Sequence, residues 1–576
     1  MRLLKKRTLI LTAAFLTAVL VGCTPAGSLS AVTSGSSSSA AVSTSSDTAA
    51  SSAVSAVSTD DAAPTGEYSA GDLDGTWDSS TSVTVACSGT DAAVSGSGVT
   101  VENGVITITA AGTYVFTGSF SGQIVVNVAD TEKVQLVLDG VSVTSTDGPA
   151  INIRQADKVF ITLADGTENT VADSSNYTLE TGTNEPNACI YSKADLTFNG
   201  TGSLSVTGNY DHGVYCKDDL KVCGGNITVN AVNDGLKGKD SVSICNAVLS
   251  ITSGGDAIKS SNTTDAGKGY IILDSGSIAI DATGDGIQAA TSLTINGGAV
   301  DIQNCDEGLE STSVVVNGGR IVINSADDGI NASDSTTAAA GGSASSSACQ
   351  LAINGGTLII TAGGDGIDSN GSLAITGGVV LVSTASNGNG ALDYDSTGTI
   401  TGGIVIAADT GSMSENFTTD STQGALLVSV GSQSAGTRVT LTGADGSVIA
   451  SYTPTTSYNT VVISAPAMTQ GSSYTVSVGG TAEADASGFA SSGALSGGTE
   501  VSTATLDSLI TGSGTGMGGM GGMGAMAGGH TGGGRMGAAG PGMTADGTTG
   551  ATTTDNAGGG TAATDGVSGA TTGSGN

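Results

Sequence analysis

A turn containing an acidic residue recurs in the middle of this chain at intervals of about 22 residues, and this period constrains the fold most strongly. Each turn is followed by short β-type runs separated by Gly-Gly or a similar turn, as at residues 297–298, 318–319 and 355–356. A fixed period without a helical pattern predicts a solenoid, because one repeat cannot bury its apolar face alone. We therefore expect an all-β right-handed parallel β-helix, since parallel crossover connections are right-handed.

The composition suits thin β-coils better than a core built on large rings. Only 3% of the residues are aromatic, whereas 38% are hydrophobic and 91 of the 576 residues are glycine. Branched aliphatic side chains fit a pleated, half-buried surface. We expect interior columns formed by Ile244, Ile271, Ile295, Val316, Ile353 and Ile375.

Changes in composition divide the chain into six segments. These are a lipoprotein signal peptide at 1–22, a Ser/Ala/Thr-rich tether at 23–66, an N-terminal β region that starts the solenoid at 67–145, the parallel β-helix at 146–410, a small β module or cap at 411–481, and a disordered Gly/Met/Thr-rich tail at 482–576.

The N-terminus has the layout of an export signal. Four cationic side chains within the first seven residues precede an apolar run at 9–21, which is too short to span a bilayer. The ending Leu20-Val21-Gly22-Cys23 resembles the bacterial lipobox, which implies cleavage before Cys23 and attachment of lipid to its sulfur. The alternative is a plain signal peptide. We expect an exported protein that is lipid-anchored to the bacterial membrane and faces the cell exterior.

The charge excludes one class of partner. The chain has 52 acidic and 17 basic residues, for a net charge of −35. Nucleic acid binding needs clustered Lys and Arg, so we expect no nucleic acid partner. The excess of acid serves either solubility or the binding of divalent cations.

The spacing of the acidic turns suits calcium. Coils of a β-helix are about 4.8 Å apart, and one ion at about 2.3–2.6 Å from its oxygen ligands spans that distance. The predicted ligands are Asp234, Asp256, Asp285, Asp306, Glu307, Glu310, Asp327, Asp328, Asp365, Asp368 and Asp393, with Asn331 able to complete a shell. The alternative is that Asp-Gly simply favours tight turns.

Lysines also align between repeats. Lys193, Lys217 and Lys239 form one predicted column, and Lys237 and Lys259 form another. These lysines are either a site for sugar carboxylates or an intramolecular ladder of ion pairs. Cys223 and Cys245 fall at matching positions too, either as a disulfide between coils or as small buried fillers.

No residue is predicted to be catalytic. The chain has only two histidines, and it contains no nucleophile elbow, zinc-protease motif or phosphate-binding loop. An enzyme of this fold would be a polysaccharide lyase that uses calcium and a Lys or Arg base, and the sequence does not single out that base.

Several whole segments are similar to a bacterial family of carbohydrate-binding domain-containing proteins with a pectate-lyase-like parallel β-helix. They are residues 112–118 (GTYVFTG), 134–141 (VQLVLDGV), 148–151 (GPAI), 163–169 (LADGTEN), 195–204 (DLTFNGTGSL) and 235–242 (GLKGKDSV). The resemblance covers about residues 100–480 and implies Ca²⁺ in the helix and binding of an acidic, pectin-like or other plant polysaccharide without established catalysis. We expect a monomeric surface lipoprotein that binds such a glycan. The alternatives are a calcium-dependent polysaccharide lyase and a structural or adhesive solenoid.

Overall fold

The computed structural model of the protein describes residues 66–334, 348–385, 388–411 and 413–512. The predicted signal peptide, Cys23, most of the tether and the tail from residue 513 lie outside the described residues. No helix in the described part of the chain is long and apolar enough to cross a bilayer.

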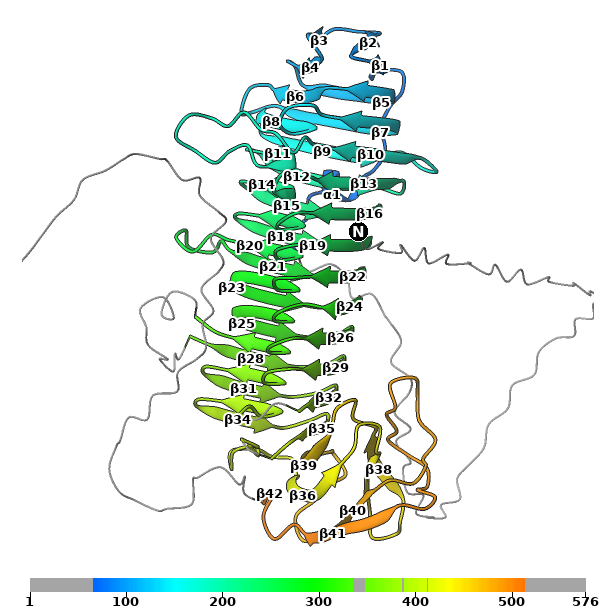
Figure 1. Ribbon diagram of the computed structural model, residues 1–576, viewed down its shortest axis with the longest axis vertical. Helices are drawn as coiled ribbons and strands as arrows, with labels where there is room; N and C mark the ends of the chain where they lie inside the picture. The colour runs from blue at the N-terminus through cyan, green and yellow to red at the C-terminus, as the bar shows by residue number, and fades with distance from the viewer. Residues whose placement is uncertain (1–65, 335–347, 386–387, 412, 513–576) are drawn as a thin grey trace, which may run out of the picture. The chain divides into compact units, whose positions relative to one another are not determined.

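Three strands from each repeat pair in parallel with the equivalent strands of the next repeat, so that the chain builds three ladders, here named A, B and C (Figure 1). Ladder A contains β9 (Lys158–Leu163), β12 (Asp195–Gly200), β15 (Asp219–Val222), β18 (Ser241–Ile244), β21 (Tyr270–Leu273), the second halves of β23 (Ile287–Ile295) and β25 (Leu309–Val316), β28 (Gln350–Ile353), β31 (Ser372–Ile375) and β34 (Thr397–Ile400). Ladder B contains β10 (Glu168–Ala172), β13 (Ser203–Gly208), β16 (Asn226–Ala231), β19 (Ala247–Ser253), β22 (Gly276–Ala282), β24 (Ala299–Asn304), β26 (Arg320–Ser325), β29 (Thr357–Ala362), β32 (Val379–Thr384) and β35 (Ile404–Asp409). Ladder C contains β8 (Ile151–Gln155), β11 (Ala188–Ser192), β14 (His212–Cys216), β17 (Leu236–Gly238), β20 (Ile258–Ser260), the first halves of β23 and β25, β27 (Ile330–Ala332), β30 (Ile367–Ser369) and β33 (Leu392–Tyr394).

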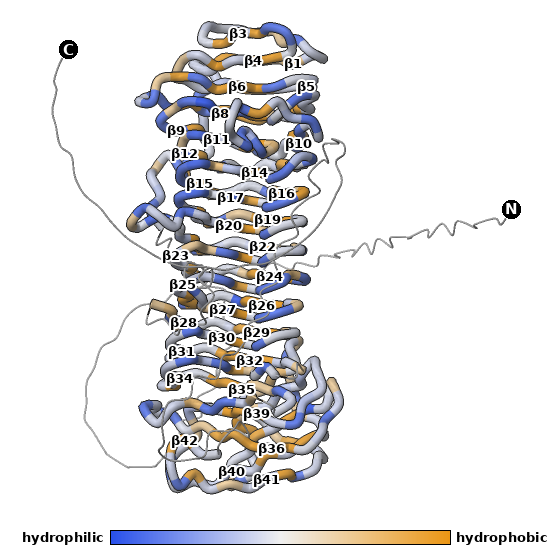
Figure 2. The backbone as a smooth tube through the Cα atoms, turned by 60° about the vertical axis from the view of Figure 1, so that its left-hand side comes forward, coloured by the Kyte–Doolittle hydropathy of each residue, from blue (hydrophilic) through white to orange (hydrophobic). Residues whose placement is uncertain are grey.

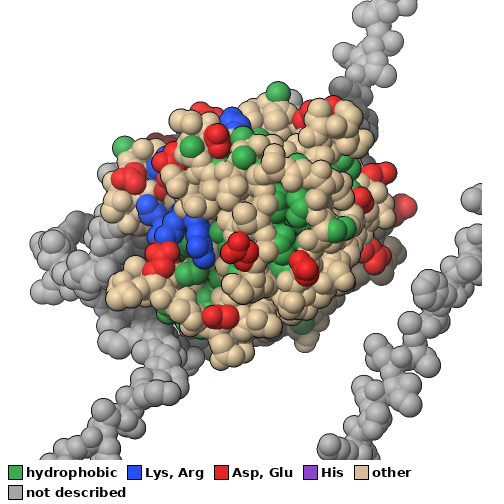
Figure 3. Space-filling model, turned by 90° about the horizontal axis from the view of Figure 1, so that it is seen from above, with side chains coloured by type: hydrophobic (Ala, Val, Ile, Leu, Met, Phe, Trp, Pro, Cys, Tyr) green, Lys and Arg blue, Asp and Glu red, His purple; other side chains and the backbone are tan. Residues whose placement is uncertain are grey.

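The ends of the ladders carry other strands. At the N-terminal end are β1 (Val83–Gly89), β2 (Asp91–Val94), β3 (Val99–Glu102), β4 (Val105–Ile108), β5 (Gly112–Ser121), β6 (Gln123–Asn127) and β7 (Lys133–Thr144), with β1–β2 and β3–β4 antiparallel. Apolar side chains are visible between polar ones at this end, and acidic side chains lie both near its middle and at its margin (Figure 3). At the other end are β36 (Ala425–Gln433), β37 (Val439–Thr442), β38 (Val448–Tyr452), β39 (Tyr458–Ser464), β40 (Ser473–Val478), β41 (Thr499–Thr505) and β42 (Ile510–Thr511).

The C-terminal module is larger than the sequence indicates. β39 pairs antiparallel with β35, and a separate sheet has the order β38-β37-β40-β41. β41 and β42 lie beyond residue 481, where the module is predicted to end. The reason is that β41 pairs with β40 through its backbone, so that a strand rich in Thr and Ser is built without a strong apolar pattern.

Alternating side chains fill the interior between the ladders. β19 is buried at every second residue, and successive coils repeat similar alternations of apolar and polar positions (Figure 2). Ile244, Ile295, Val316, Ile353 and Ile375 stand in one fully buried column, whereas Ile271 lies in the adjacent column with Val242 and Leu293. Burial of one such side chain contributes about 1.5–3 kcal/mol, so the repeated column is the main stabilising element.

The Gly-Gly turns allow the coils to approach. Gly319 has a φ of 87°, and a Cβ atom there would lie 2.7 Å from the carbonyl oxygen of Gly298 in the preceding coil. Only glycine fits this combination of left-handed backbone and close contact. Cys223 and Cys245 are both buried and are not bonded to each other, which agrees with the interpretation as small fillers.

The all-β class and the stacking of parallel strands are confirmed. Hydrogen bonds between equivalent turns of adjacent coils give the length of each repeat. The bonded residues are 22 positions apart for His212 and Asp234, 29 positions apart for Asp256 and Asp285, and 37 positions apart for Asp328 and Asp365. The longer steps contain insertions, so the coils keep their register while the connecting loops vary. The hand of the coil stays a prediction, as does a common coil length.

Residues 66–78, here called the strap, cross the outer side of ladder A. The strap includes the short helix α1 (Ala70–Leu73), which begins with a capping box formed by Ser69 and Asp72. Asp72 is fully buried; its carboxylate lies 2.6 Å from Lys158 Nζ and 3.7 Å from Lys221 Nζ. The hydroxyl of Thr197 donates a hydrogen bond of 2.7 Å to the same carboxylate. The strap is thus fixed to β9, β12 and β15 by one buried acid.

We predict that Asp72→Asn lowers the free energy of unfolding by about 3–5 kcal/mol, because it leaves buried Lys158 without a charged partner. Denaturant unfolding measures the change. Asp74→Asn is the control, since Asp74 is an exposed carboxylate on the same strap. Equal stabilities of the two variants would contradict the anchoring role of Asp72.

The same ion pair predicts a pH dependence. Burial alone would raise the pKa of Asp72, but hydrogen bonds from Lys158, Thr197 and Ser69 outweigh it and lower the pKa to about 2. Because an unfolded Asp has a pKa near ~3.9, the stabilising contribution is complete above that value and is lost as the pH falls through about 2. The difference in stability between wild type and Asp72→Asn should therefore be constant from pH 5 to pH 8 and shrink below pH 4, as thermal melting at stepped pH can measure.

Candidate functional site

One outward position of ladder C forms a continuous line of functional side chains, here called the strip. In register from coil to coil it contains Tyr191, Tyr215, Lys237, Lys259, Gln288, Glu310, Asn331, Asp368 and Asp393. In the three-residue strands β17 and β20 the second residue is partly exposed and its two neighbours are buried. Tyr191 of β11 and Asn331 of β27 occupy the same register position but are themselves buried. Its chemistry changes along the stack from aromatic to basic to acidic.

A second column lies beside the strip, three residues earlier in each coil. This turn column contains Asp234, Asp256, Asp285, Glu307, Asp328 and Asp365. Its aspartates accept hydrogen bonds from the backbone N–H of the next coil, for example 2.8 Å from Asp285 to Asp256 and 2.6 Å from Asp365 to Asp328. The Glu307 carboxylate instead accepts from the side-chain amide of Asn331. One oxygen of such an aspartate therefore ties two coils together, and the other is available to the strip.

Two of these carboxylates are neutralised by lysines of the strip. Lys237 Nζ lies 2.8 Å from Asp234, and Lys259 Nζ lies 2.5 Å from Asp256. In the next coil the neutral Gln288 donates a hydrogen bond of 2.8 Å to Asp285. The strip has no lysine or arginine from Gln288 to Asp393. The acidic residues of these coils thus lie together without a cation from the strip.

Asp285, Glu307 and Glu310 form the first acid cluster. Each offers one oxygen, and these oxygens all lie within 4.8 Å of one another. Burial, followed by the charges of Asp256 and Glu310, raises the pKa of Asp285 to about 8. Burial and the charges of Glu310 and Asp285 raise the pKa of Glu307 to about 10. Each of the three carboxylates lies close to the other two, and a bound cation would offset their mutual repulsion.

The amide of Asn331 completes this cluster. Its nitrogen donates to both carboxylate oxygens of Glu307 at 3.2 Å. Its oxygen is buried and has no hydrogen-bond partner among the described residues. A buried acceptor without a donor is costly, and calcium accepts amide oxygens as well as carboxylates as ligands. The residues of the first acid cluster therefore fit a calcium ion.

Asp328, Asp365, Asp368 and Asp393 form a second acid cluster farther along the ladder. Burial and neighbouring acids raise the pKa values of Asp328 and Asp365 to about 7 and that of Asp368 to about 8. Asp368 and Asp393 are register partners in adjacent coils. As in the first cluster, carboxylates of the turn column here accept backbone hydrogen bonds, from Asp365 to Asp328 and from Gly390 to Asp365.

Two of the predicted calcium ligands stand apart from these clusters. Asp306 and Asp327 are exposed and precede Glu307 and Asp328 by one residue. The backbone N–H of Asp327 donates to the carbonyl of Asp306, so the two form a separate outer column. The sequence places two acids in each of these turns, and only the register distinguishes the one that faces the strip.

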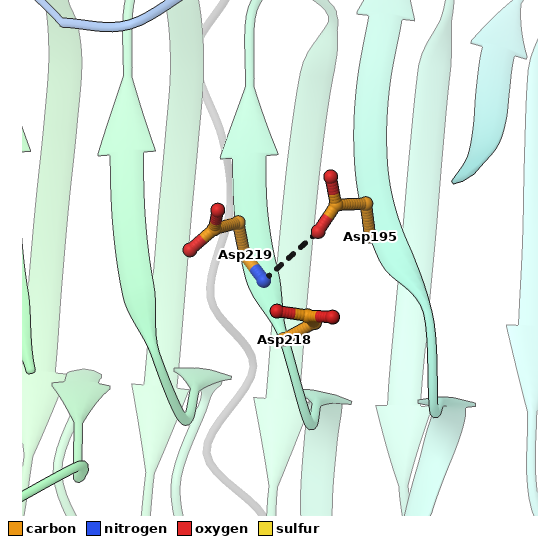
Figure 4. Close-up of side chains that lie close together, drawn as sticks. All are labelled: Asp195, Asp218 and Asp219. Atoms are coloured by element: carbon orange, nitrogen blue, oxygen red, sulfur yellow. Dashed lines mark hydrogen bonds between the residues drawn. The ribbon is translucent and has the colours of Figure 1, made fainter. Parts of the chain in front are cut away.

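A third acidic group lies beside ladder A, where the sequence predicts no metal ligands. Asp195, Asp218 and Asp219 converge there, and the N–H of Asp219 donates to Asp195 at 3.3 Å (Figure 4). Burial and the charges of Asp195 and Asp219 raise the pKa of Asp218 to about 6. Lys268 Nζ lies 3.5 Å from Asp219 and supplies a positive charge. The repeated Asp-Leu at 195–196 and 219–220 is the signal that could have revealed this group.

The five predicted sugar-binding lysines all have carboxylate partners. Besides Lys237 and Lys259, Lys193 lies 2.9 Å from Glu180, Lys239 lies 3.7 Å from Asp240, and Lys217 pairs with Glu185. An intramolecular ladder of ion pairs, the alternative to a site for sugar carboxylates, predicts such pairing. Lys239 and Lys193 keep 38% and 36% of their side-chain surface exposed, so their positive charges remain accessible. Contact with sugar stays a prediction.

Aromatic side chains gather at the N-terminal part of the strip, which the sequence does not predict. The rings of Tyr191 and Tyr215 meet edge to face at 5.8 Å, and Lys237 Nζ lies 5.3 Å from the centre of the Tyr215 ring. Nearby, Tyr177 and Tyr210 stack at 4.1 Å. Four of the 11 tyrosines therefore lie within this short region. Their signal in the sequence is the recurrence of tyrosine at equivalent positions of two adjacent repeats.

Lys259 of the strip and the neighbouring His212 are poorly suited to remove a proton. Burial would lower the pKa of Lys259, but the charges of Asp256 and Asp234 outweigh it and raise that pKa, which keeps the amine protonated. Burial and Lys237 lower the pKa of His212, so its ring is neutral, but the side chain is only 3% exposed. A general base must reach its substrate, and neither group combines a free lone pair with access.

Part of the chain is similar to known proteins. Residues 102–350 match the family model described as "Carbohydrate-binding domain-containing protein". A protein of that name from Acetivibrio thermocellus is 44% identical over 136 residues, which cover 23% of this chain and 48% of the relative. The chain thus spans about half the length of that relative.

A solved structure is also similar. It is the polysaccharide lyase-like protein from C. thermocellum, in a gadolinium derivative, with 38% sequence identity and a TM-score of 0.37 over 41% of this chain and 92% of that chain. The family model and the relative together confirm, for residues 102–350, the predicted similarity to carbohydrate-binding domain-containing proteins.

Proposed function

We propose that the strip binds an acidic polysaccharide at the bacterial cell surface and that calcium is held in its acidic half. The observation that carries this proposal is the order of side chains along one ladder: tyrosines, then lysines, then carboxylates without a lysine or arginine of the strip. A sugar chain offers flat rings and carboxylates at repeated intervals, so a repeated strip matches it in form.

The first acid cluster supports the calcium part of the proposal. Asp285, Glu307 and Glu310 supply three charges, and Asn331 supplies a neutral oxygen. All are hard oxygen donors, which calcium prefers. Calcium bound there would cancel the mutual repulsion of the carboxylates and satisfy the amide oxygen. The second acid cluster has a similar donor set.

The net charge of −35 supports a role for cations in glycan binding. A polyanionic sugar approaching such a surface is repelled unless positive charge lies at the contact. The partly exposed Lys193 and Lys239 beside the strip, and calcium in its acidic half, would provide that charge. Half-buried Tyr215, with Lys237 near its ring, provides an apolar surface for a sugar face.

Binding is favoured over cleavage for a physical reason. A polysaccharide lyase needs an accessible base that is neutral at the working pH. The carboxylate neighbours of Lys259 raise its pKa, and His212 is buried. If the solenoid were purely adhesive, the buried Asn331 oxygen without a hydrogen-bond partner and the group of tyrosines would have no function.

We predict that calcium stabilises the folded chain through the first acid cluster. Excess calcium at about 100 times its dissociation constant should add about 2.7 kcal/mol of stability, measured as a rise in Tm relative to chelator. Glu310→Gln should abolish most of this rise. It should also raise the Tm in chelator, because it removes the carboxylate whose charge raises the pKa values of Asp285 and Glu307.

Asp306→Asn is the matched control for that experiment, because Asp306 is an acidic neighbour that is exposed in the outer column. It should keep the calcium response of wild type. A Tm that calcium leaves unchanged, or a response that Asp306→Asn and Glu310→Gln reduce equally, would contradict calcium binding at this cluster.

We further predict that Tyr215→Ala weakens binding of an oligogalacturonate by about tenfold in calorimetry with calcium present, because an aromatic side chain supplies much of the contact area of a site. Tyr270→Ala is the control, since Tyr270 is a half-buried tyrosine at the start of β21 in ladder A. Binding that is absent in wild type, or that both variants weaken alike, would show that the strip is not the glycan site.

We also propose export and lipid attachment at Cys23, which the export-type N-terminus supports. Labelled palmitate fed to cells that express the full chain should be incorporated into wild type and not into Cys23→Ser. Equal labelling of wild type and Cys23→Ser would contradict lipid attachment at Cys23.

A further inference from the structure

A groove of about 520 Å³ lies between the strap and the turns that follow β9, β12, β15 and β18. Leu73 and Trp77 line it from the strap, and Asp165, Thr201 and Asn246 line it from the coils. The groove is on the ladder A side, whereas the strip follows ladder C. It therefore offers a second place on the molecule with its own chemistry.

The strap brings exposed apolar surface to this groove. Trp77 is the only tryptophan in the chain and is half-buried. Leu73 is 47% exposed. In the described ranges, the other exposed large hydrophobic residues are Val232 and Val248. An exposed leucine next to a tryptophan in a concave site indicates a contact surface more than a defect of packing.

Strap and coil meet through two glycines that line the groove, Gly75 and Gly200. A Cβ atom on Gly75 would lie 2.6 Å from the Cα of Gly200, so strap and coil touch directly there. Two contacts hold the strap in place beside the groove. Buried Asp72 pairs with Lys158, and the backbone carbonyl of Asp74 accepts a hydrogen bond from the side chain of Asn199. The groove is thus preformed, which lowers the entropic cost of binding.

The polar groups suit hydroxyls. The hydroxyl of Thr201 donates to Asp165 at 2.8 Å, and exposed Asn246 adds an amide. Neither lysine nor arginine lines the groove, and Asp165 is its acidic lining residue. An anionic ligand would meet a carboxylate without a neutralising partner, so the chemistry favours a ligand without charge.

We propose that this groove binds a neutral sugar chain. A pyranose has C–H groups on its faces and hydroxyls around its edge. The faces would lie against Trp77 and Leu73, and the hydroxyls would bond to Asp165, Thr201 and Asn246. The site needs no metal ion, and it stands independently of the calcium and acidic glycan proposed for the strip.

The single tryptophan makes a direct test possible, because all indole emission reports on the groove. The full chain is titrated with three neutral probes, cellohexaose, xylohexaose and mannohexaose, in chelator. At least one should shift the emission of Trp77 in a saturable way. Leu73→Ala should weaken that binding by about fivefold or more, because it removes exposed apolar contact, whereas Val232→Ala, at another exposed apolar residue, should not.

Calorimetry extends the test to the tryptophan itself. Trp77→Ala should weaken binding of the same probe by about tenfold or more, since an indole ring supplies a large contact area, and Trp77→Phe should retain part of it. Both variants should bind oligogalacturonate with calcium as wild type does. No saturable shift with any of the three probes at millimolar concentration, or equal binding by wild type and Trp77→Ala, would overturn the neutral sugar site.

Discussion

The structure depends on the stacking of equivalent residues in successive coils. Parallel backbone pairing fixes the distance between coils at about 4.8 Å, so a residue type that recurs in the sequence becomes a column in space. Apolar columns such as the one through Ile244 and Ile295 form the core. The same rule places side chains of one type next to each other on the outside, whether or not they attract one another.

This rule has different consequences for different columns. Aliphatic columns gain from contact, and the glycine turns allow the backbone to approach. The acidic column has two opposing effects on stability. Each hydrogen bond from a backbone N–H to a carboxylate stabilises the fold, whereas repulsion between the carboxylates destabilises it. Lys237 and Lys259 remove the repulsion in two coils. From Gln288 onward the strip no longer supplies lysine, and the raised pKa values of Asp285, Glu307 and Asp368 are the physical sign of that change.

Much of the fold could be predicted because it is local and periodic. The acidic turns and the β-type runs repeat, so the parallel coils and the alignment of Lys237 with Lys259 follow from spacing alone. The strap could not be predicted in this way, since Asp72 meets Lys158 and Lys221 at long range. The end of the C-terminal module was missed because β41 pairs through backbone and carries little apolar signal.

The candidate site could be predicted in position but not in detail. The turns that carry Asp285 and Glu307 were found by their spacing, yet the choice between Asp306 and Glu307 needed the register. The lysine partners, the orphan oxygen of Asn331 and the tyrosines around Tyr215 depend on which side chains face outward in neighbouring coils. Trp77 lies outside the repeats altogether, so no column could have indicated its groove.

The proposed function depends most on the proposed binding of calcium by the acids beside ladder C. An anomalous difference map from crystals grown with calcium tests it most directly. The account predicts a peak bounded by oxygens of Asp285, Glu307 and Glu310 and by the amide oxygen of Asn331. A fully ordered cluster without such a peak, or a peak only beside Asp195, Asp218 and Asp219, would contradict it.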